Sequence, residues 1–295
     1  MIKIIDLNFQ GHSQTVAAFL IETSAGPVLL ETGPHSMWSN LVRGVNAAGY
    51  DMSDIRHVLL THIHLDHAGA SWALAQQGAT VYVHPVGAPH LIDPERLMAS
   101  ARRIYREDMD RLWGDMQAIP EERVKLIDHE ATVQVGQSVF RAWHTPGHAV
   151  HHIAWQLDHV LFTGDVGGVK INDVQVVPPC PPPEFQLEDW LNSLALIRGL
   201  NPDMLYLTHF GPVEDVSTHL DILEATLHDW AGWMKIRWER GDSPETILPE
   251  FRQYVIDQLR RAGADEANLV RYETANPVEM NLTGLLRYWK KRSPA

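Results

Sequence analysis

Four side chains that commonly bind metal ions lie close together in the first quarter of the chain. They follow the pattern H-x-H-x-D-H and are His62, His64, Asp66 and His67. The apolar run just before them predicts a buried strand over residues 57–61. Because side chains alternate across a strand, His62 and His64 are expected to share one face. Imidazole and carboxylate groups together suit zinc and similar metals, so the loop predicts a metal site.

The second half of this loop lies where the chain must turn. Asp66 is expected to cap a helix that begins at Ala68. The alternative interpretation is a solvated histidine-rich loop, because the chain contains 17 histidines. Low-complexity metal tracts lack a fixed order of ligand types, which favours the metal site.

Three later stretches place further ligands at the ends of predicted strands. His148 follows Pro146-Gly147, which prevents a helix and predicts a tight turn that carries this histidine outward. Asp165 comes just after the apolar strand 160–163, where a buried carboxylate needs a partner or a metal ion. His209 follows the strand 204–208. The neighbouring histidines are expected to pack in the core or to orient ligands, and they are His144, His151 and His152.

In this ordered series of ligands, the sequence resembles the metallo-β-lactamase-fold hydrolases, a superfamily that includes glyoxalase II, N-acyl-homoserine lactonases and ribonuclease Z. The resemblance covers residues 1 to about 213. It implies an α/β fold, a four-layer αββα sandwich with metal ions at one edge between two sheets. Residues 1–213 would form the catalytic domain, with a helical insertion at about 86–120. Residues 214–295 would form a C-terminal helical extension packed on that domain.

The resemblance also implies a role for each candidate ligand. His62, His64 and His148 would hold the first metal ion, Asp66, His67 and His209 would hold the second, and Asp165 would bridge both. His148 is preferred to His144 because it ends the T-P-x-H pattern of the family. Glu31 stands where the family usually has an aspartate that supports the ligand loop.

This ligand set predicts a metal-dependent hydrolase. Two divalent ions about 3.5–4 Å apart bring the pKa of a shared water near 7, so a metal-bridging hydroxide is expected to attack an ester, thioester or lactone. Zinc is the first expectation for both ions, with manganese or iron as alternatives. The resemblance gives Asp66 a catalytic role, as ligand and proton acceptor. Cys180 is expected to be structural.

Two other functions use the same fold and are kept as alternatives. A phosphodiester or phosphotriester would fit the same two metal ions. An iron-dependent oxidoreductase is the other alternative. Flavodiiron oxygen reductases of the superfamily typically carry a carboxylate at the position of His64, so this histidine favours hydrolysis.

The composition limits the classes of molecule that this protein is expected to bind. The net charge of −13 argues against a nucleic-acid backbone as the main partner, so a small-molecule substrate is expected. Arg96, Arg103 and Arg106 of the insertion are expected to form a solvated face, with contact to an anionic substrate as the alternative. The N-terminus lacks a signal-peptide pattern and no apolar run is long enough to span a bilayer, so a cytoplasmic protein without a membrane partner is expected.

The C-terminal extension predicts amphipathic helices. Leu220, Leu223, Leu227, Trp230 and Met234 recur at spacings of three and four, which marks one apolar stripe. Ser243-Pro244 is a typical start for a second helix. We expect these helices to pack on the main body, and a homodimer interface is the second interpretation.

Overall fold

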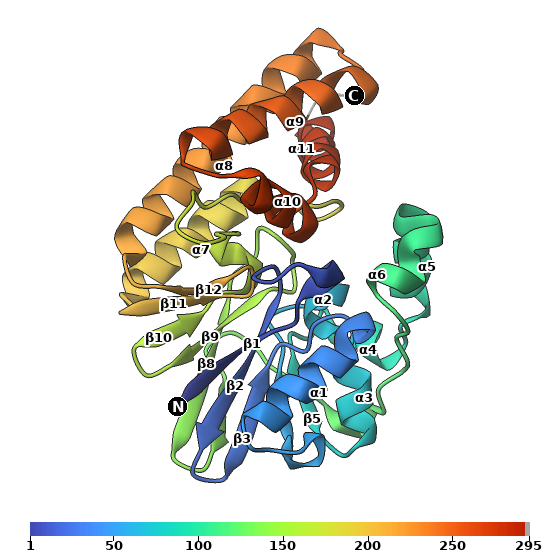
Figure 1. Cartoon of the computed structure of the whole chain (residues 1–295), viewed down its shortest axis with the longest axis vertical. Helices are drawn as coiled ribbons and strands as arrows, with labels where there is room; N and C mark the ends of the chain where they lie inside the picture. Colours follow the sequence, from blue (N-terminus) through green and yellow to red (C-terminus); the bar gives the residue numbers. More distant parts are fainter. Residues whose placement is uncertain (293–295) are drawn as a thin grey trace.

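The computed structural model describes residues 1–292 and contains two six-stranded sheets packed face to face, with helices on both outer faces (Figure 1). The first sheet has the strand order β1-β2-β3-β4-β5-β6. Its strands are β1 (Ile2–Asp6), β2 (Ala17–Thr23), β3 (Gly26–Leu30), β4 (His57–Leu59), β5 (Thr80–Val83) and β6 (Val124–Leu126). The second sheet has the order β12-β11-β10-β9-β8-β7. Its strands are β7 (Thr132–Val135), β8 (Ser138–His144), β9 (Ile153–Leu157), β10 (Val160–Phe162), β11 (Met204–Leu207) and β12 (Gly211–Val213).

The helices lie between the strands in the first two thirds of the chain and follow one another at its end. The α-helices before residue 213 are α1 (Trp38–Ala47), α2 (Leu65–Ala68), α3 (Ser71–Gln76), α4 (Ala88–Ile92), α5 (Glu95–Tyr105), α6 (Met109–Leu112) and α7 (Leu187–Leu200). Those after it are α8 (Val216–Arg240), α9 (Pro244–Arg261), α10 (Glu266–Ala275) and α11 (Val278–Arg292). Two short 3-10 helices also matter for the site, η1 (Phe9–Gly11) and η6 (Gly164–Gly167).

Three hydrophobic cores correspond to the layers of the sandwich. Between the sheets, large buried side chains of β2, β9 and β10 meet, and they include Phe19, Trp155 and Phe162. A second core lies between the first sheet and its helices, and a third lies between the second sheet, α7 and the C-terminal helices. Each sheet is therefore apolar on both faces, which matches the predicted αββα fold.

The strand before the histidine loop is shorter than the sequence predicts. It ends at Leu59 rather than Thr61, because the backbone leaves the first sheet at this point. The Thr61 carbonyl accepts a hydrogen bond from the Ile153 N–H of β9, at 2.7 Å, in the second sheet. The loop that carries His62 and His64 thus crosses from one sheet towards the other.

The structure also contains a strand that the sequence did not predict. β12 pairs antiparallel with β11 through Leu207 and Gly211 and through Leu205 and Val213. Gly211-Pro212 indicates a turn in sequence, but proline is tolerated in an edge strand, and β12 lies at the edge of its sheet.

The C-terminal helices pack on three parts of the chain: the second sheet, the connection between η6 and α7, and α7 itself. Ser243 caps α9 as predicted, and its side chain accepts a hydrogen bond from the Thr246 N–H. Asn281 of α11 accepts a 2.6 Å hydrogen bond from the buried N–H of Cys180. None of the helices within residues 1–292 is both long and apolar enough to cross a membrane. The division of the chain at residue 213 stays a prediction, as does a homodimer.

Gly284 of α11 lies directly against the backbone of Cys180, and a Cβ atom at this position would overlap the Cys180 carbonyl oxygen. We predict that Gly284→Ala lowers the free energy of unfolding by about 1–3 kcal/mol, because two backbone segments must separate. Gly232→Ala on the exposed face of α8 is the matched control, since nothing lies within 4 Å of its added Cβ.

The control substitution should raise stability by up to about 1 kcal/mol through helix propensity. Urea unfolding of both variants measures the difference. An equal gain in stability for both would contradict the close approach of α11 to residue 180.

Candidate metal centre

The seven predicted ligands come together at one end of the sandwich, between the two sheets. His62 and His64 lie in the loop after β4, and Asp66 and His67 lie in α2. The other three come from the second half of the chain, where His148 follows β8, Asp165 lies in η6 and His209 follows β11. They form two groups in which the ligand atoms lie within 4.8 Å of one another. The groups are His62, His64, His148 and Asp165, and Asp66, His67 and His209.

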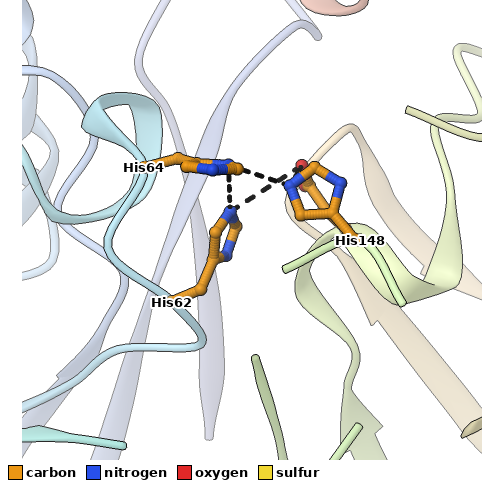
Figure 2. Close-up of side chains that lie close together, drawn as sticks. His62, His64 and His148 are labelled. Carbon is orange, nitrogen blue, oxygen red and sulfur yellow. Dashed lines mark hydrogen bonds and ion pairs between the residues drawn. The ribbon is translucent and has the colours of Figure 1, made fainter. Parts of the chain in front are cut away.

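The first group is held together by short distances between ring nitrogens. His64 Nδ1 lies 2.9 Å from His62 Nε2 and 2.9 Å from His148 Nε2. Figure 2 shows the three imidazoles pointing towards one another from two separate segments of the chain. Asp165 Oδ2 completes the group at 3.2 Å from His148 Nε2 and 3.9 Å from His62 Nε2.

The second group faces the other oxygen of the same carboxylate. Asp165 Oδ1 lies 3.1 Å from His67 Nε2 and 3.3 Å from His209 Nε2. Asp66 Oδ2 lies 3.6 Å and 3.4 Å from the same two nitrogens. Each oxygen of Asp165 therefore faces one group, which is the arrangement that a bridging ligand requires.

Outer hydrogen bonds direct the histidine lone pairs inward. His148 Nδ1 lies 2.9 Å from the Pro179 carbonyl oxygen, and His209 Nδ1 lies 2.7 Å from the Thr15 carbonyl oxygen. A carbonyl only accepts, so both Nδ1 atoms must carry hydrogen and donate it. The Nε2 atoms of His148 and His209 are therefore unprotonated in the neutral ring and present lone pairs to the centre.

Glu31 performs the same task for the ligand loop. Its fully buried carboxylate accepts a hydrogen bond from the Thr61 hydroxyl and lies 3.2 Å from His67 Nδ1. The Thr61 oxygen then accepts from His62 Nδ1, at 3.0 Å. Glutamate in place of the usual aspartate still reaches these two partners, so both His62 and His67 keep Nε2 free for a metal ion.

The arrangement is unfavourable without a cation and fits metal ions. His62 Nε2 and His148 Nε2 both point at His64 Nδ1, yet a single hydrogen on that atom could satisfy only one of them. Three further atoms of the centre are buried and have no hydrogen-bond partner within the described residues. They are His67 Nε2, Asp165 Oδ1 and His209 Nε2. Cations bound between these atoms would satisfy all of them, and imidazole with carboxylate is a donor set that zinc accepts.

Burial and mutual charge shape the titration of these groups. Burial, with His67 and His64 nearby, holds the pKa of His62 well below its usual value, and burial with His148 nearby lowers the pKa of His64 to about 4. Burial would raise the pKa of Asp165, but His67, His148 and His209 outweigh it and hold that pKa well below its usual range. Two rings behave differently: although burial opposes it, Asp165 and Asp66 raise the pKa of His209 to about 9, and together with Glu31 they hold the pKa of His67 well above its usual value. Metal ions must displace these protons, because neutral imidazoles and an ionised carboxylate are the forms that bind metal.

The prediction that Asp66 caps a helix is wrong, and the prediction that the neighbouring histidines lie outside the ligand groups is confirmed. Asp66 does not cap a helix, because α2 begins at Leu65 with His64 as its N-cap residue and Asp66 lies in the first turn. Its carboxylate instead turns towards His67 and His209. The histidines expected outside the ligand sets do lie outside them. His144 stacks on His84 with ring centroids 4.4 Å apart, and His152 Nδ1 lies 2.8 Å from the Thr145 hydroxyl.

Most of the groups that orient the ligands through hydrogen bonds could not be identified from the sequence. The Thr15 and Pro179 contributions are backbone carbonyls, which any residue could provide, so the sequence carries no signal for them. Glu31 was indicated by the family resemblance as a support of the ligand loop, whereas Thr61, which lies directly before His62, was given no role in sequence.

A cavity of about 220 Å³ opens beside the centre. Four of the ligands line it, and they are His64, Asp66, His148 and Asp165. Most of the remaining lining comes from η1, the α5–α6 insertion, the proline loop 179–183 and the C-terminal segment of α10 and α11. The centre can therefore meet a molecule bound in this cavity.

Comparison with known proteins agrees with the predicted fold and family. The family model of the metallo-beta-lactamase superfamily matches residues 14–209. The chain belongs to this superfamily. The five histidines and two aspartates that the sequence predicts as ligands form two groups that could each hold a metal ion.

Two curated relatives illustrate the range of the superfamily. Metallo-beta-lactamase fold-containing protein ST1585 of Sulfurisphaera tokodaii is 29% identical over 171 residues, which cover 55% of this chain and 63% of the relative. An atrochrysone carboxyl ACP thioesterase of Aspergillus fumigatus is 26% identical over 213 residues, covering 71% of this chain and 41% of the relative. The chain thus matches less than two thirds of the length of each.

Two solved structures share the fold along nearly the whole chain. The crystal structure of TTHA1429, a metallo-beta-lactamase family protein from Thermus thermophilus, has a TM-score of 0.71 at 21% identity and covers 99% of this chain and 93% of that one. The structure of ST1585 has a TM-score of 0.66 at 20% identity, with coverage of 96% and 97%. At these identities the likeness concerns the fold alone.

Glu31 provides a test of the outer hydrogen bonds. We predict that Glu31→Gln weakens metal binding about 10–100-fold, because the amide lacks the negative charge beside His67 Nδ1 and its NH2 group cannot accept from the Thr61 N–H as Glu31 Oε2 does. Competition with a chromogenic chelator measures the affinity. Glu130→Gln, at an exposed carboxylate outside the ligand groups and the cavity lining, should leave it unchanged. Equal affinities for the two variants would contradict the role of Glu31.

Proposed function

We propose that this protein is a dinuclear metal-dependent hydrolase that cleaves an ester, thioester or lactone of a small metabolite. The observation that carries the proposal is Asp165, whose two oxygens face two separate groups of buried ligands beside a cavity. Membership of the superfamily supports it, and one relative is named as a thioesterase. Zinc is the first candidate for both ions.

Bound metal ions would supply hydroxide near neutral pH and would polarise the oxygen of the scissile bond. The residues of the chain prepare the centre for this chemistry. Asp66 lines the cavity, and although burial opposes it, His67 and His209 lower the pKa of its carboxyl to about 2. Its carboxylate is therefore ionised at neutral pH, which is the form that binds a metal ion.

A nucleophilic side chain is not needed in this proposal. Cys180 is fully buried, burial raises the pKa of its thiol well above the usual value, and it does not line the cavity. The Tyr105 phenol lines the cavity and stays protonated, since burial and the nearby Asp66 raise its pKa above that of an ordinary tyrosine. The nucleophile in this proposal is thus water.

A phosphodiester is the second candidate for the same centre, because two metal ions also suit phosphoryl transfer. Its anionic oxygens would need cationic partners beyond the metal ions. Among the described residues that line the cavity there is no Arg or Lys. Arg96, Arg103 and Arg106 of the insertion are exposed and lie outside the lining. A carbonyl substrate is therefore the better match.

Asp165→Asn tests the proposal most directly. We predict that hydrolysis falls by more than about 100-fold, the upper effect of outer-shell partners, because this residue contacts both ligand groups. The measurement is a screen of thioesters, lactones and phosphodiesters with zinc, manganese and iron each supplied. Asp158→Asn in the exposed turn between β9 and β10 is the control and should keep full activity.

Circular dichroism of the variants separates loss of chemistry from loss of fold. An unchanged rate in folded Asp165→Asn would contradict the bridging role. One iron per chain with oxygen uptake and no hydrolysis would contradict the hydrolase itself.

A further inference from the structure

The cavity beside the metal centre is walled on one side by an apolar stripe of the insertion. Leu97, Ala101 and Ile104 of α5 recur at spacings of four and three, so they lie on one face of the helix, and all three line the cavity. Ile104 keeps 46% of its surface exposed there, although it is a large apolar residue. The arginines of α5 lie on its other faces, exposed and outside the lining.

Aromatic side chains extend this wall towards the metal centre. Trp113 stacks on Phe9 of η1 with ring centroids 5.4 Å apart, and Tyr105 meets Trp113 edge to face at 5.0 Å. All three line the cavity. Because each ring is packed against its neighbour, the wall is preorganised rather than formed by mobile side chains.

The opposite wall comes from the second half of the chain. Pro181, Pro182 and Pro183 line it together with Met280 of α11. The proline loop is held by the C-terminal helices, since Asn281 accepts from the Cys180 N–H and Asn276 donates to the Pro178 carbonyl at 3.2 Å. Figure 1 shows the α5–α6 segment and the α10–α11 segment on the same end of the sandwich.

The charge of the lining selects the kind of group that fits. Its charged side chains are the acidic ligands Asp66 and Asp165, its two histidines are the ligands His64 and His148, and none of the described lining residues is an arginine or lysine. An anionic group bound away from the metal ions would find no arginine or lysine among these side chains, and burying its charge against the apolar walls would be costly. An uncharged apolar group would instead be covered on both sides by apolar side chains.

We propose that the substrate carries an uncharged apolar group of medium size, bound between α5 and the wall formed by the proline loop and Met280, next to the bond that is hydrolysed. This inference rests on the proposed hydrolase function and deepens it. The group is attached either on the acyl side or on the alcohol or thiol side of that bond. The insertion and the C-terminal helices are then the two parts of the chain that determine specificity.

The metal-loaded protein is assayed with two series of substrates. One series varies the acyl chain of 4-nitrophenyl esters from acetyl through butyryl and hexanoyl to octanoyl. The other varies the alkyl chain of thioacetates over the same lengths. We expect kcat/KM to rise in one series by up to about 4-fold for each buried methylene. A glutaryl ester, similar in length to the hexanoyl ester but anionic, should be cleaved more slowly than it.

Ile104→Lys tests where the group binds. The side chain is exposed enough for the variant to fold, and a charge in the apolar wall should lower the ratio of long-chain to short-chain kcat/KM by about 10-fold or more. Val270→Lys is the matched control, because Val270 on α10 is 48% exposed and lies outside the cavity lining. This control should keep the wild-type ratio.

The outcomes separate the two proposals. Hydrolysis of short esters without any gain along either series, or a preference for the glutaryl ester, would overturn the apolar site while leaving the hydrolase intact. An unchanged ratio in Ile104→Lys would also overturn it. If no ester or thioester were cleaved with any of the metals, this result would contradict the proposed hydrolase function, on which the proposal of the apolar site rests.

Discussion

The buried carboxylate of Asp165 is the constraint on which the rest of this structure depends. It is surrounded by imidazoles on both of its oxygens, and several of these atoms lack hydrogen-bond partners in the described chain. Such a gathering of lone pairs and negative charge is costly unless protons on His67 and His209 or bound metal ions neutralise it. The other six ligands either follow a strand or lie in α2, so two sheets must meet at a defined distance for the centre to exist.

The sandwich secures that distance through contacts that cross between the sheets. The Trp155 indole N–H donates to the Leu60 carbonyl at 2.9 Å, and the Ile153 N–H donates to the Thr61 carbonyl at 2.7 Å. Both acceptors precede the histidine loop by at most two residues. The loop is therefore anchored to the second sheet before its first ligand, which places it opposite Asp165 and His148.

The sequence predicted the ligands better than their supports. H-x-H-x-D-H, a strand-end aspartate and two turn histidines are visible as residue types, and hydrophobic periodicity placed most strands and helices. The early end of β4 depends on a backbone hydrogen bond to β9, which no local pattern encodes. Asp66 was expected to cap a helix because local propensity favours that role, but the tertiary attraction of His67 and His209 outweighs it.

The docking of the last helix has a consequence for the metal centre itself. The Asn281 side chain accepts a hydrogen bond from the Cys180 N–H. The carbonyl of the preceding residue, Pro179, accepts one from His148 Nδ1. One residue of α11 is thus linked through two hydrogen bonds and a single peptide unit to a ligand of the first group. A shift of α11 would therefore move the loop whose carbonyl orients His148, so the packing of the last helix and the geometry of the first ligand group are coupled.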